Sequence, residues 1–246
     1  MSPLMIMSPF VLVPAIFFIA GLMQGLTGFG CALIAMPLLA YVVDIKIAVP
    51  VCTLCGIFIN LNMTYKLRKS LDRNKILPLI IGSVPGSVFG TMMLKEVNGD
   101  YIRLFLGLLI AGFAAYSLIA KPIKLNISDK WGYLSGFMTG AIAAAVSAGG
   151  PPTIIYTSLR DWDKDSFKAT LVSFFMAAGI MAAVGHLLSG LTTIYIFKLF
   201  LASTLPIVMG TLAGGMISGL LSEDFYRRIV MVLLVIMGLM LIFQNV

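Results

Sequence analysis

The first 43 residues of the chain contain no charged side chain, and this feature limits the possible folds more than any other. A run of about 18 or more apolar residues is long enough to cross the hydrocarbon core of a bilayer as a helix. Several runs of that length follow, and 60% of the 246 residues are hydrophobic while only 11% are charged. A soluble globular domain does not have this composition. The chain is therefore expected to be an all-α polytopic membrane protein.

Two clusters of glycine and proline interrupt the apolar segments at a depth where a membrane helix should be continuous. The first cluster is residues 25–31 (Gly-Leu-Thr-Gly-Phe-Gly-Cys), and the second is residues 146–152 (Val-Ser-Ala-Gly-Gly-Pro-Pro). Glycine permits backbone angles that other residues avoid, and proline stops a helix that runs into it. Within a bilayer, the backbone groups freed by such a break are tolerated where they line a cavity. We therefore expect both breaks to face a cavity.

The length of each broken segment predicts a re-entrant hairpin made of two half-length helices. Residues 9–43 form a segment of 35 residues, which is too long for one crossing of about 20 residues and too short for two. The broken segment 131–159 has the same character. Single crossings are expected at 47–65, 76–94 and 102–120 in a first repeat (1–120), and at 169–189, 196–220 and 229–245 in a second repeat (131–246), with a polar cytoplasmic linker at 121–130.

Corresponding features recur at an offset of about 120 to 125 residues, which indicates an internal duplication. Thr27 corresponds to Ser147, and Gly90 corresponds to Gly210. Each repeat has three crossings, which is an odd number, so the two repeats are expected to be inverted relative to each other. The hairpins then enter from opposite faces and their tips meet near the midplane, as in many secondary transporters.

The basic residues distinguish re-entrant hairpins from single crossings. With re-entrant hairpins, 13 of the 17 Lys and Arg residues fall on one side of the membrane, whereas single crossings would split them 9 to 8. Cytoplasmic loops carry an excess of basic residues, so the first arrangement is favoured. Both termini are then expected on the outer side of a bacterial cytoplasmic (inner) membrane. The basic residues left on that side are Lys46, Lys95, Arg103 and Lys198.

The polar residues of the apolar segments favour an anionic substrate. All ten acidic residues lie in loops or at segment ends, whereas carriers of cations usually place a carboxylate within the bilayer. The second helix of each hairpin begins at its break, where free N–H groups and the positive end of the helix dipole can hold an anion. Hydroxyl groups near the breaks can donate further hydrogen bonds. The candidate substrate-binding residues are Thr27, Gly28, Phe29, Gly30, Cys31, Thr53, Ser147, Ala148, Gly149, Gly150, Thr153 and Ser173.

Simpler interpretations exist for several of these residues. The glycines can serve helix packing alone, and His186, near the outer end of its crossing, can have a packing role. Cys52 and Cys55 form a C-x-x-C without a second pair or a nearby histidine, so packing explains them better than a metal or redox site. An intramembrane enzyme would need a nucleophile with a base, and Ser147 has no evident partner. We expect no cofactor, no metal and no nucleic acid.

The motifs also follow a specific order along nearly the whole chain. The first half contains Gly21, Gly25, Gly28, Gly30, Pro37, Thr53 and the pair Pro85 and Gly90; the second half contains Ser147 to Pro152, then Lys168-Ala169-Thr170, then Pro206 and Gly210. This order and spacing resemble the sulfite exporter TauE/SafE family of membrane proteins. The resemblance implies movement of small sulfur oxyanions or organosulfonates, often outward, across the bacterial cytoplasmic membrane. Phe29 stands where many members are richer in glycine, so it is expected to reshape the pocket.

The expected function is transport of a sulfite-class or organosulfonate anion, with export by alternating access at a midplane site formed by the two hairpin tips. Proton-coupled uptake of a sulfur oxyanion and a passive anion channel are the alternatives. The sequence identifies neither the anion, the direction nor a coupling ion, and it leaves open a monomer or a homodimer in the lipid bilayer. It also leaves open whether Lys46, Lys168 or His186 takes part.

Overall fold

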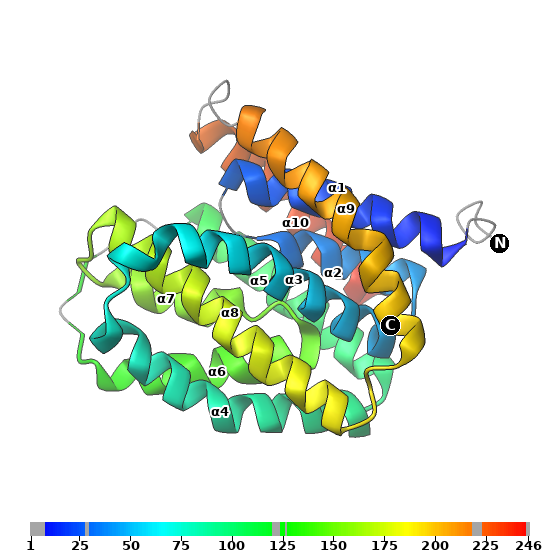
Figure 1. Cartoon of the computed structure of the whole chain (residues 1–246), viewed down its shortest axis with the longest axis horizontal. Helices are drawn as coiled ribbons and strands as arrows, with labels where there is room; N and C mark the ends of the chain where they lie inside the picture. The colour runs from blue at the N-terminus through cyan, green and yellow to red at the C-terminus, as the bar shows by residue number, and fades with distance from the viewer. Residues whose placement is uncertain (1–7, 28–29, 120–123, 126, 218–222, 245–246) are drawn as a thin grey trace.

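The computed structural model describes residues 8–27, 30–119, 124–125, 127–217 and 223–244 (Figure 1). The first half contains α1 (Pro9–Thr27), α2 (Cys31–Val42), α3 (Ile45–Leu67), the short 3-10 helix η2 (Arg68–Ser70), α4 (Arg73–Glu96) and α5 (Gly99–Ile119). The second half contains α6 (Lys130–Val146), α7 (Gly150–Leu159), α8 (Lys164–Leu188), α9 (Ile194–Ile217) and α10 (Glu223–Gln244). Within the described residues, six helices (α1, α3, α4, α5, α8 and α9) are long and apolar enough to cross a membrane. The prediction of an all-α polytopic membrane protein is confirmed.

The two broken segments fold as helical hairpins, α1–α2 and α6–α7. In Figure 1 the open end of α1–α2 lies at the right of the molecule, while that of α6–α7 lies at the left. α1 is longer than the expected half-length helix: it has 19 residues, and at 1.5 Å per residue it extends roughly 28 Å. It continues through Gly25 because this glycine packs against α9, where an added Cβ would lie 2.2 Å from the Thr211 carbonyl oxygen. The first break therefore begins after Thr27.

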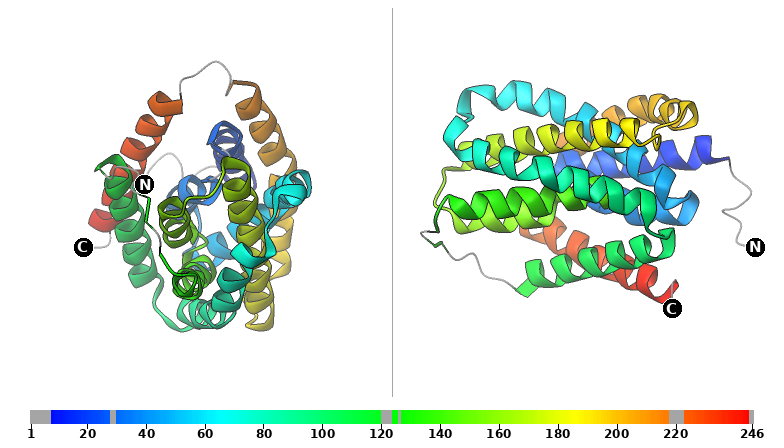
Figure 2. Two further views of the ribbon diagram at one scale, coloured as in Figure 1. Left: turned by 90° about the vertical axis from the view of Figure 1, so that its left-hand side faces the viewer. Right: turned by 90° about the horizontal axis from the view of Figure 1, so that it is seen from below.

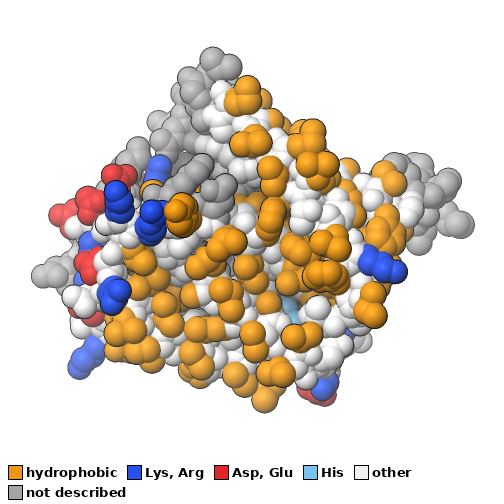
Figure 3. Space-filling view, viewed as in Figure 1, with side chains coloured by type: hydrophobic (Ala, Val, Ile, Leu, Met, Phe, Trp, Pro, Cys, Tyr) orange, Lys and Arg blue, Asp and Glu red, His pale blue; other side chains and the backbone are white. Residues whose placement is uncertain are grey.

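α4 illustrates how these helices suit a bilayer. Its buried face is small or hydroxyl-bearing and includes Gly82, Ser83, Gly86, Ser87, Gly90 and Thr91. Its opposite face exposes large apolar side chains at Leu77, Ile81, Val84, Val88 and Met92. Small residues let membrane helices approach closely, while lipid tails solvate the large ones. Figure 3 shows the result on one face: hydrophobic side chains cover a broad band, and charged side chains gather towards its ends.

Glycine contacts join α4 to α6 and α9 to α1 in corresponding ways. A Cβ on Gly86 would lie 2.1 Å from the Phe137 carbonyl oxygen, and one on Gly210 would lie 2.1 Å from the Phe18 carbonyl oxygen. The next turn repeats the pattern, at Gly90 against Ala141 and at Gly214 against Leu22. Each hairpin therefore packs on a crossing of the other half, at positions related by the sequence offset. This reciprocity supports two related repeats.

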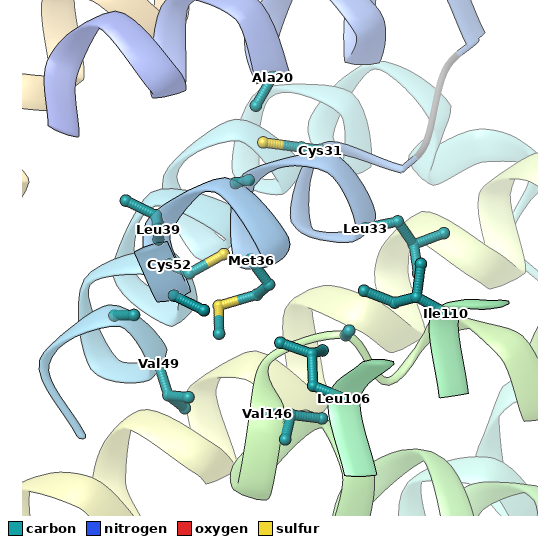
Figure 4. Close-up of a cluster of buried hydrophobic side chains, with 14 of the residues drawn as sticks. Ala20, Cys31, Leu33, Met36, Leu39, Val49, Cys52, Leu106, Ile110 and Val146 are labelled. Atoms are coloured by element: carbon teal, nitrogen blue, oxygen red, sulfur yellow. The ribbon is translucent and has the colours of Figure 1, made fainter. Parts of the chain in front are cut away.

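The remaining helices place the hairpins around a common interior. α5 and α10 lie together along one side of the molecule in both views of Figure 2, in close contact where Gly107 and Gly238 meet. α2 is almost enclosed, with seven of its 12 residues buried. Figure 4 shows Leu33 of α2 beside Ile110 of α5, and Met36 of α2 towards Leu106 of α5. A short helix enclosed by protein does not need to span the bilayer, but its buried ends require polar partners.

Candidate functional site

Described residues from both chain breaks line one cavity of about 100 Å³. A water molecule takes up about 30 Å³ in the liquid, so the space suits a few waters or one small oxyanion. The walls come from the two hairpin bends and from α3 and α8. Among the residues that line it, the structure describes no Asp, Glu, Lys, Arg or His. The predicted site residues found in this lining are Gly30, Cys31, Thr53, Ser147, Ala148, Gly149 and Gly150.

Two predicted site residues lie elsewhere. Thr153 Oγ1 is 2.7 Å from Thr139 Oγ1, and this hydrogen bond joins α7 to α6 within the second hairpin. Ser173 is buried on α8, and within the described part of the chain its Oγ has no hydrogen-bond partner. Neither residue lines the cavity. Outside the described residues lie Gly28, Phe29 and the side chain of Thr27.

Several lining residues were missed by the sequence interpretation, namely Gln24, Gly56, Thr139 and Gly179. Gly56 of α3 and Gly179 of α8 are separated by the repeat offset and stand in helix interiors, where glycine is unfavourable. A Cβ added to Gly56 would meet nothing within 4 Å, because this position opens into the cavity. The repeat offset together with the unfavourable residue type was the available signal for these two glycines.

The first wall of the cavity is the N-terminus of α2. Its N-cap is Gly30, which has φ of 100° and no capping side chain. The first three helical residues (Cys31, Ala32 and Leu33) all line the cavity. Their N–H groups precede the helical hydrogen-bond ladder, and they carry the positive end of the helix dipole. The Cys31 N–H donates to Gln24 Oε1 at 3.0 Å, across the bend of the hairpin.

The second wall contains Ser147 in an unfavourable backbone conformation. Its φ is 56°, and it is the one non-glycine residue with positive φ among those described. This conformation costs a side-chain-bearing residue roughly 1–2 kcal/mol, and such outliers concentrate at functional sites. Ser147 Oγ lies 3.2 Å from Thr53 Oγ1, and Thr53 Oγ1 donates to the Val49 carbonyl oxygen at 2.9 Å. A hydroxyl is thus retained at the bend although glycine would be more stable there.

The two walls differ in their donors. α7 begins at Gly150, and its next two residues are Pro151 and Pro152, which have no N–H. Gly150 is therefore the one N–H donor among the first three residues of α7, whereas α2 has three, of which that of Cys31 donates to Gln24. Gly149 is needed for a different reason, because a Cβ there would lie 2.6 Å from the Thr139 carbonyl oxygen. The second wall relies on the Ser147 hydroxyl where the first wall relies on backbone N–H groups.

Comparison with known proteins identifies the family. A profile described as sulfite exporter TauE/SafE matches residues 13–241, which include all but the first turn of the first hairpin, the whole second hairpin and every residue that lines the cavity. The chain belongs to this family. No curated protein and no solved structure gave a significant match. The resemblance inferred from the motifs is confirmed, and it implies a multi-pass membrane transporter for sulfite or a related small anion.

In this TauE/SafE protein, His186 contacts the second hairpin directly. It is fully buried, and its Nε2 lies 2.7 Å from the Ala144 carbonyl oxygen. Ala144 stands in the last turn of α6, where carbonyl groups lack a partner within the helix. A carbonyl can only accept, so Nε2 carries the proton, and Nδ1 has no partner among the described residues. His186 therefore caps the helix that leads into the Ser147 bend, which is a more specific contact than the packing role expected.

Lys46 also has a structural role in this TauE/SafE protein. Its Nζ donates to the Lys95 carbonyl oxygen at 2.8 Å, at the C-terminal end of α4. A cation is favourable at this end of a helix, where the dipole is negative. Neither Lys46 nor Lys168 lines the cavity. Among the described residues, the hydrogen-bond donors of the cavity are therefore helix N-termini and uncharged side chains.

Proposed function

We propose that the protein exports a small sulfur oxyanion or organosulfonate, which it binds in the cavity between the two hairpin bends. One observation carries this proposal: the N-termini of α2 and α7 line the same cavity, and no charged side chain lines it with them in the described part of the chain. Helix N-termini bind sulfate-like and phosphate-like anions through free N–H groups. A cation in the same place would meet no carboxylate.

The hydroxyl groups of the site can rearrange to receive such an anion. Thr53 has one hydroxyl hydrogen, and when it donates to Val49 the contact with Ser147 must use the Ser147 hydrogen. If Thr53 turns its hydrogen to Ser147 instead, Ser147 can donate to a ligand. This exchange breaks one hydrogen bond to a backbone carbonyl and makes a charge-assisted one, which is typically stronger. Binding is therefore coupled to the loss of a hydrogen bond within α3, while the contact between Thr53 and Ser147 is kept.

Alternating access follows from the proposed inverted arrangement. The two hairpins approach the cavity from opposite ends (Figure 1), and each packs on a crossing of the other half. Movement of one repeat against the other would open the cavity to each side in turn. In the bacterial inner membrane, with both termini outside, a monovalent anion leaving an inside-negative cell gains about 2.3 kcal/mol per 100 mV. Export then needs no coupling ion.

Transport by reconstituted vesicles tests this proposal. Vesicles loaded with methanesulfonate, which keeps its charge over a wide pH range, would be given a potassium diffusion potential that is negative inside. Efflux should be faster than at zero potential, should saturate, and should show counterflow with external sulfite. Efflux that ignores the potential and requires a pH gradient would contradict electrogenic export. Efflux without saturation or counterflow would indicate a channel.

The alternative of proton-coupled uptake would use His186, which is buried against the second hairpin, or a carboxylate of a loop. A His186→Gln variant keeps an N–H donor for the Ala144 carbonyl oxygen and removes proton exchange near neutral pH. Under the export proposal, voltage-driven efflux should persist in this variant. Loss of all transport with an unchanged melting temperature would instead favour proton coupling.

A further inference from the structure

Gln24 bridges the two helices of the first hairpin at the cavity. It stands in the last turns of α1, is 5% exposed, and lines the cavity beside Cys31. Its Oε1 accepts from the Cys31 N–H at 3.0 Å, and its Nε2 lies 3.7 Å from Met63 Sδ. Because the backbone N–H of Cys31 can only donate, the amide must present its oxygen to Cys31. The amide nitrogen, with its two hydrogens, is then the donor side of the group.

We propose that Gln24 is a specificity-determining residue that donates Nε2–H to the anion while its Oε1 fixes the N-terminus of α2. This inference rests on the proposed function, because it concerns the same cavity and the same anion. The hydrogen bond to Met63 is weak, since a thioether is a poor acceptor. Exchange of that sulfur for an anionic oxygen is favourable because charge-assisted hydrogen bonds are roughly twice as strong as neutral ones. A neutral amide therefore suits an anion here.

The second hairpin offers no matching group, which sets Gln24 apart from a general packing residue. Phe18 of α1 corresponds to Phe137 of α6, and Leu22 corresponds to Ala141, because their carbonyl groups face corresponding glycines. Two residues further along each helix, Gln24 therefore corresponds to Ala143. Ala143 also lines the cavity, but it has no polar side chain. The polar contact on the second side comes from Ser147 instead. An anion bound between the walls would thus meet an amide on one side and a hydroxyl on the other.

A Gln24→Glu variant separates this role from a purely structural one. The carboxylate keeps an acceptor for the Cys31 N–H, so the melting temperature of the purified protein should be unchanged or higher. It removes the Nε2 donor and adds a negative charge, so the apparent affinity for methanesulfonate, measured by ligand-induced thermal stabilisation, should fall at least tenfold. Asn60→Asp is the matched control, because it makes the same change from amide to carboxylate in the lining of the same cavity. It differs in position, since Asn60 lies on α3 and not beside the start of α2.

Acidification provides the second arm of the test. When the carboxyl group introduced by Gln24→Glu is protonated, it is neutral and has an O–H donor. Methanesulfonate affinity in this variant should therefore recover as the pH falls, while wild-type affinity stays flat. Equal losses in Gln24→Glu and Asn60→Asp would overturn the inference, as would an unchanged affinity in Gln24→Glu. In those cases the proposed function would stand, because the wild type binds. A wild-type protein that responds to neither methanesulfonate nor sulfite would overturn both.

Discussion

Filling the cavity from Gly56 should abolish transport without unfolding the protein. A Cβ at this position meets nothing within 4 Å, and Gly56 lines the cavity from the middle of α3. A Leu side chain adds four carbon atoms, each about as large as a water molecule of about 30 Å³, so Gly56→Leu would occupy on the order of 100 Å³. The cavity itself is about 100 Å³. The substitution would take up space that the anion needs.

The same position predicts opposite effects on stability and on transport. Glycine in a helix interior is about 1 kcal/mol less favourable than alanine, so Gly56→Ala should raise the free energy of unfolding by up to that amount. The added methyl group takes part of the cavity, so anion affinity should fall at the same time. A glycine kept at a cost in stability is expected where function needs the space it leaves.

Melting temperature in detergent and methanesulfonate efflux from vesicles would be measured on the same preparations of Gly56→Ala and Gly56→Leu. The control is Gly112→Leu, because Gly112 also has nothing within 4 Å of an added Cβ but faces a separate apolar crevice between α5 and the second hairpin. Efflux should survive in the control and fail in Gly56→Leu. Normal efflux by a folded Gly56→Leu protein would refute the assignment of this cavity as the binding site.

Three further predictions concern the bend, the helix contacts and the access to the cavity. Ser147→Gly should relieve about 1–2 kcal/mol of backbone strain and also weaken anion binding. Ser147→Ala should weaken anion binding without the gain in stability. Equal melting temperatures for the two variants would contradict the claim that the backbone at Ser147 is strained. Gly86→Ala places a Cβ 2.1 Å from a backbone oxygen, so overpacking of about 1–3 kcal/mol should lower the melting temperature, and an unchanged value would show that α4 and α6 can separate freely. A thiol reagent bearing a sulfonate should modify Cys31 and Cys52, which line the cavity, more slowly when methanesulfonate is present. It should leave Cys55 unmodified, because Cys55 is buried like the other two but does not line the cavity. Equal modification of all three, measured by mass spectrometry, would contradict the proposed access route.

The all-α membrane fold could be predicted from the sequence because membrane helices are long and their charges lie between them. The segment expected at 76–94 is found as α4, Arg73–Glu96, with Asp72 as its N-cap. The start of the first break was placed too early, at Gly25. A glycine that closes a helix contact and a glycine that ends a helix look the same in one sequence. Only the carbonyl of Thr211 facing Gly25 shows which role applies.

The candidate site was predictable where backbone chemistry dominates and not where side chains meet across helices. Gly30 and Ser147 were found because the breaks themselves point to them. Gln24 was missed because it lies within a continuous helix, and its role depends on a hydrogen bond to Cys31 that no spacing rule specifies. Thr153 was included for its hydroxyl near a helix start, but the neighbouring Thr139 hydroxyl engages it.

The unequal walls bear on how one site can serve both sides of the membrane. If the anion were held by helix N-termini alone, the two prolines after Gly150 would leave α7 the poorer partner, since proline supplies no N–H. Ser147 compensates with a hydroxyl that can donate to the anion once Thr53 of α3 turns its own hydrogen from the Val49 carbonyl oxygen to Ser147. The first wall has its donors fixed by Gln24, whereas the second gains its donor through a rearrangement that involves a crossing helix. Binding would therefore change the hydrogen bonds of Thr53, and the rearrangement expected on anion binding lies on the side of Ser147.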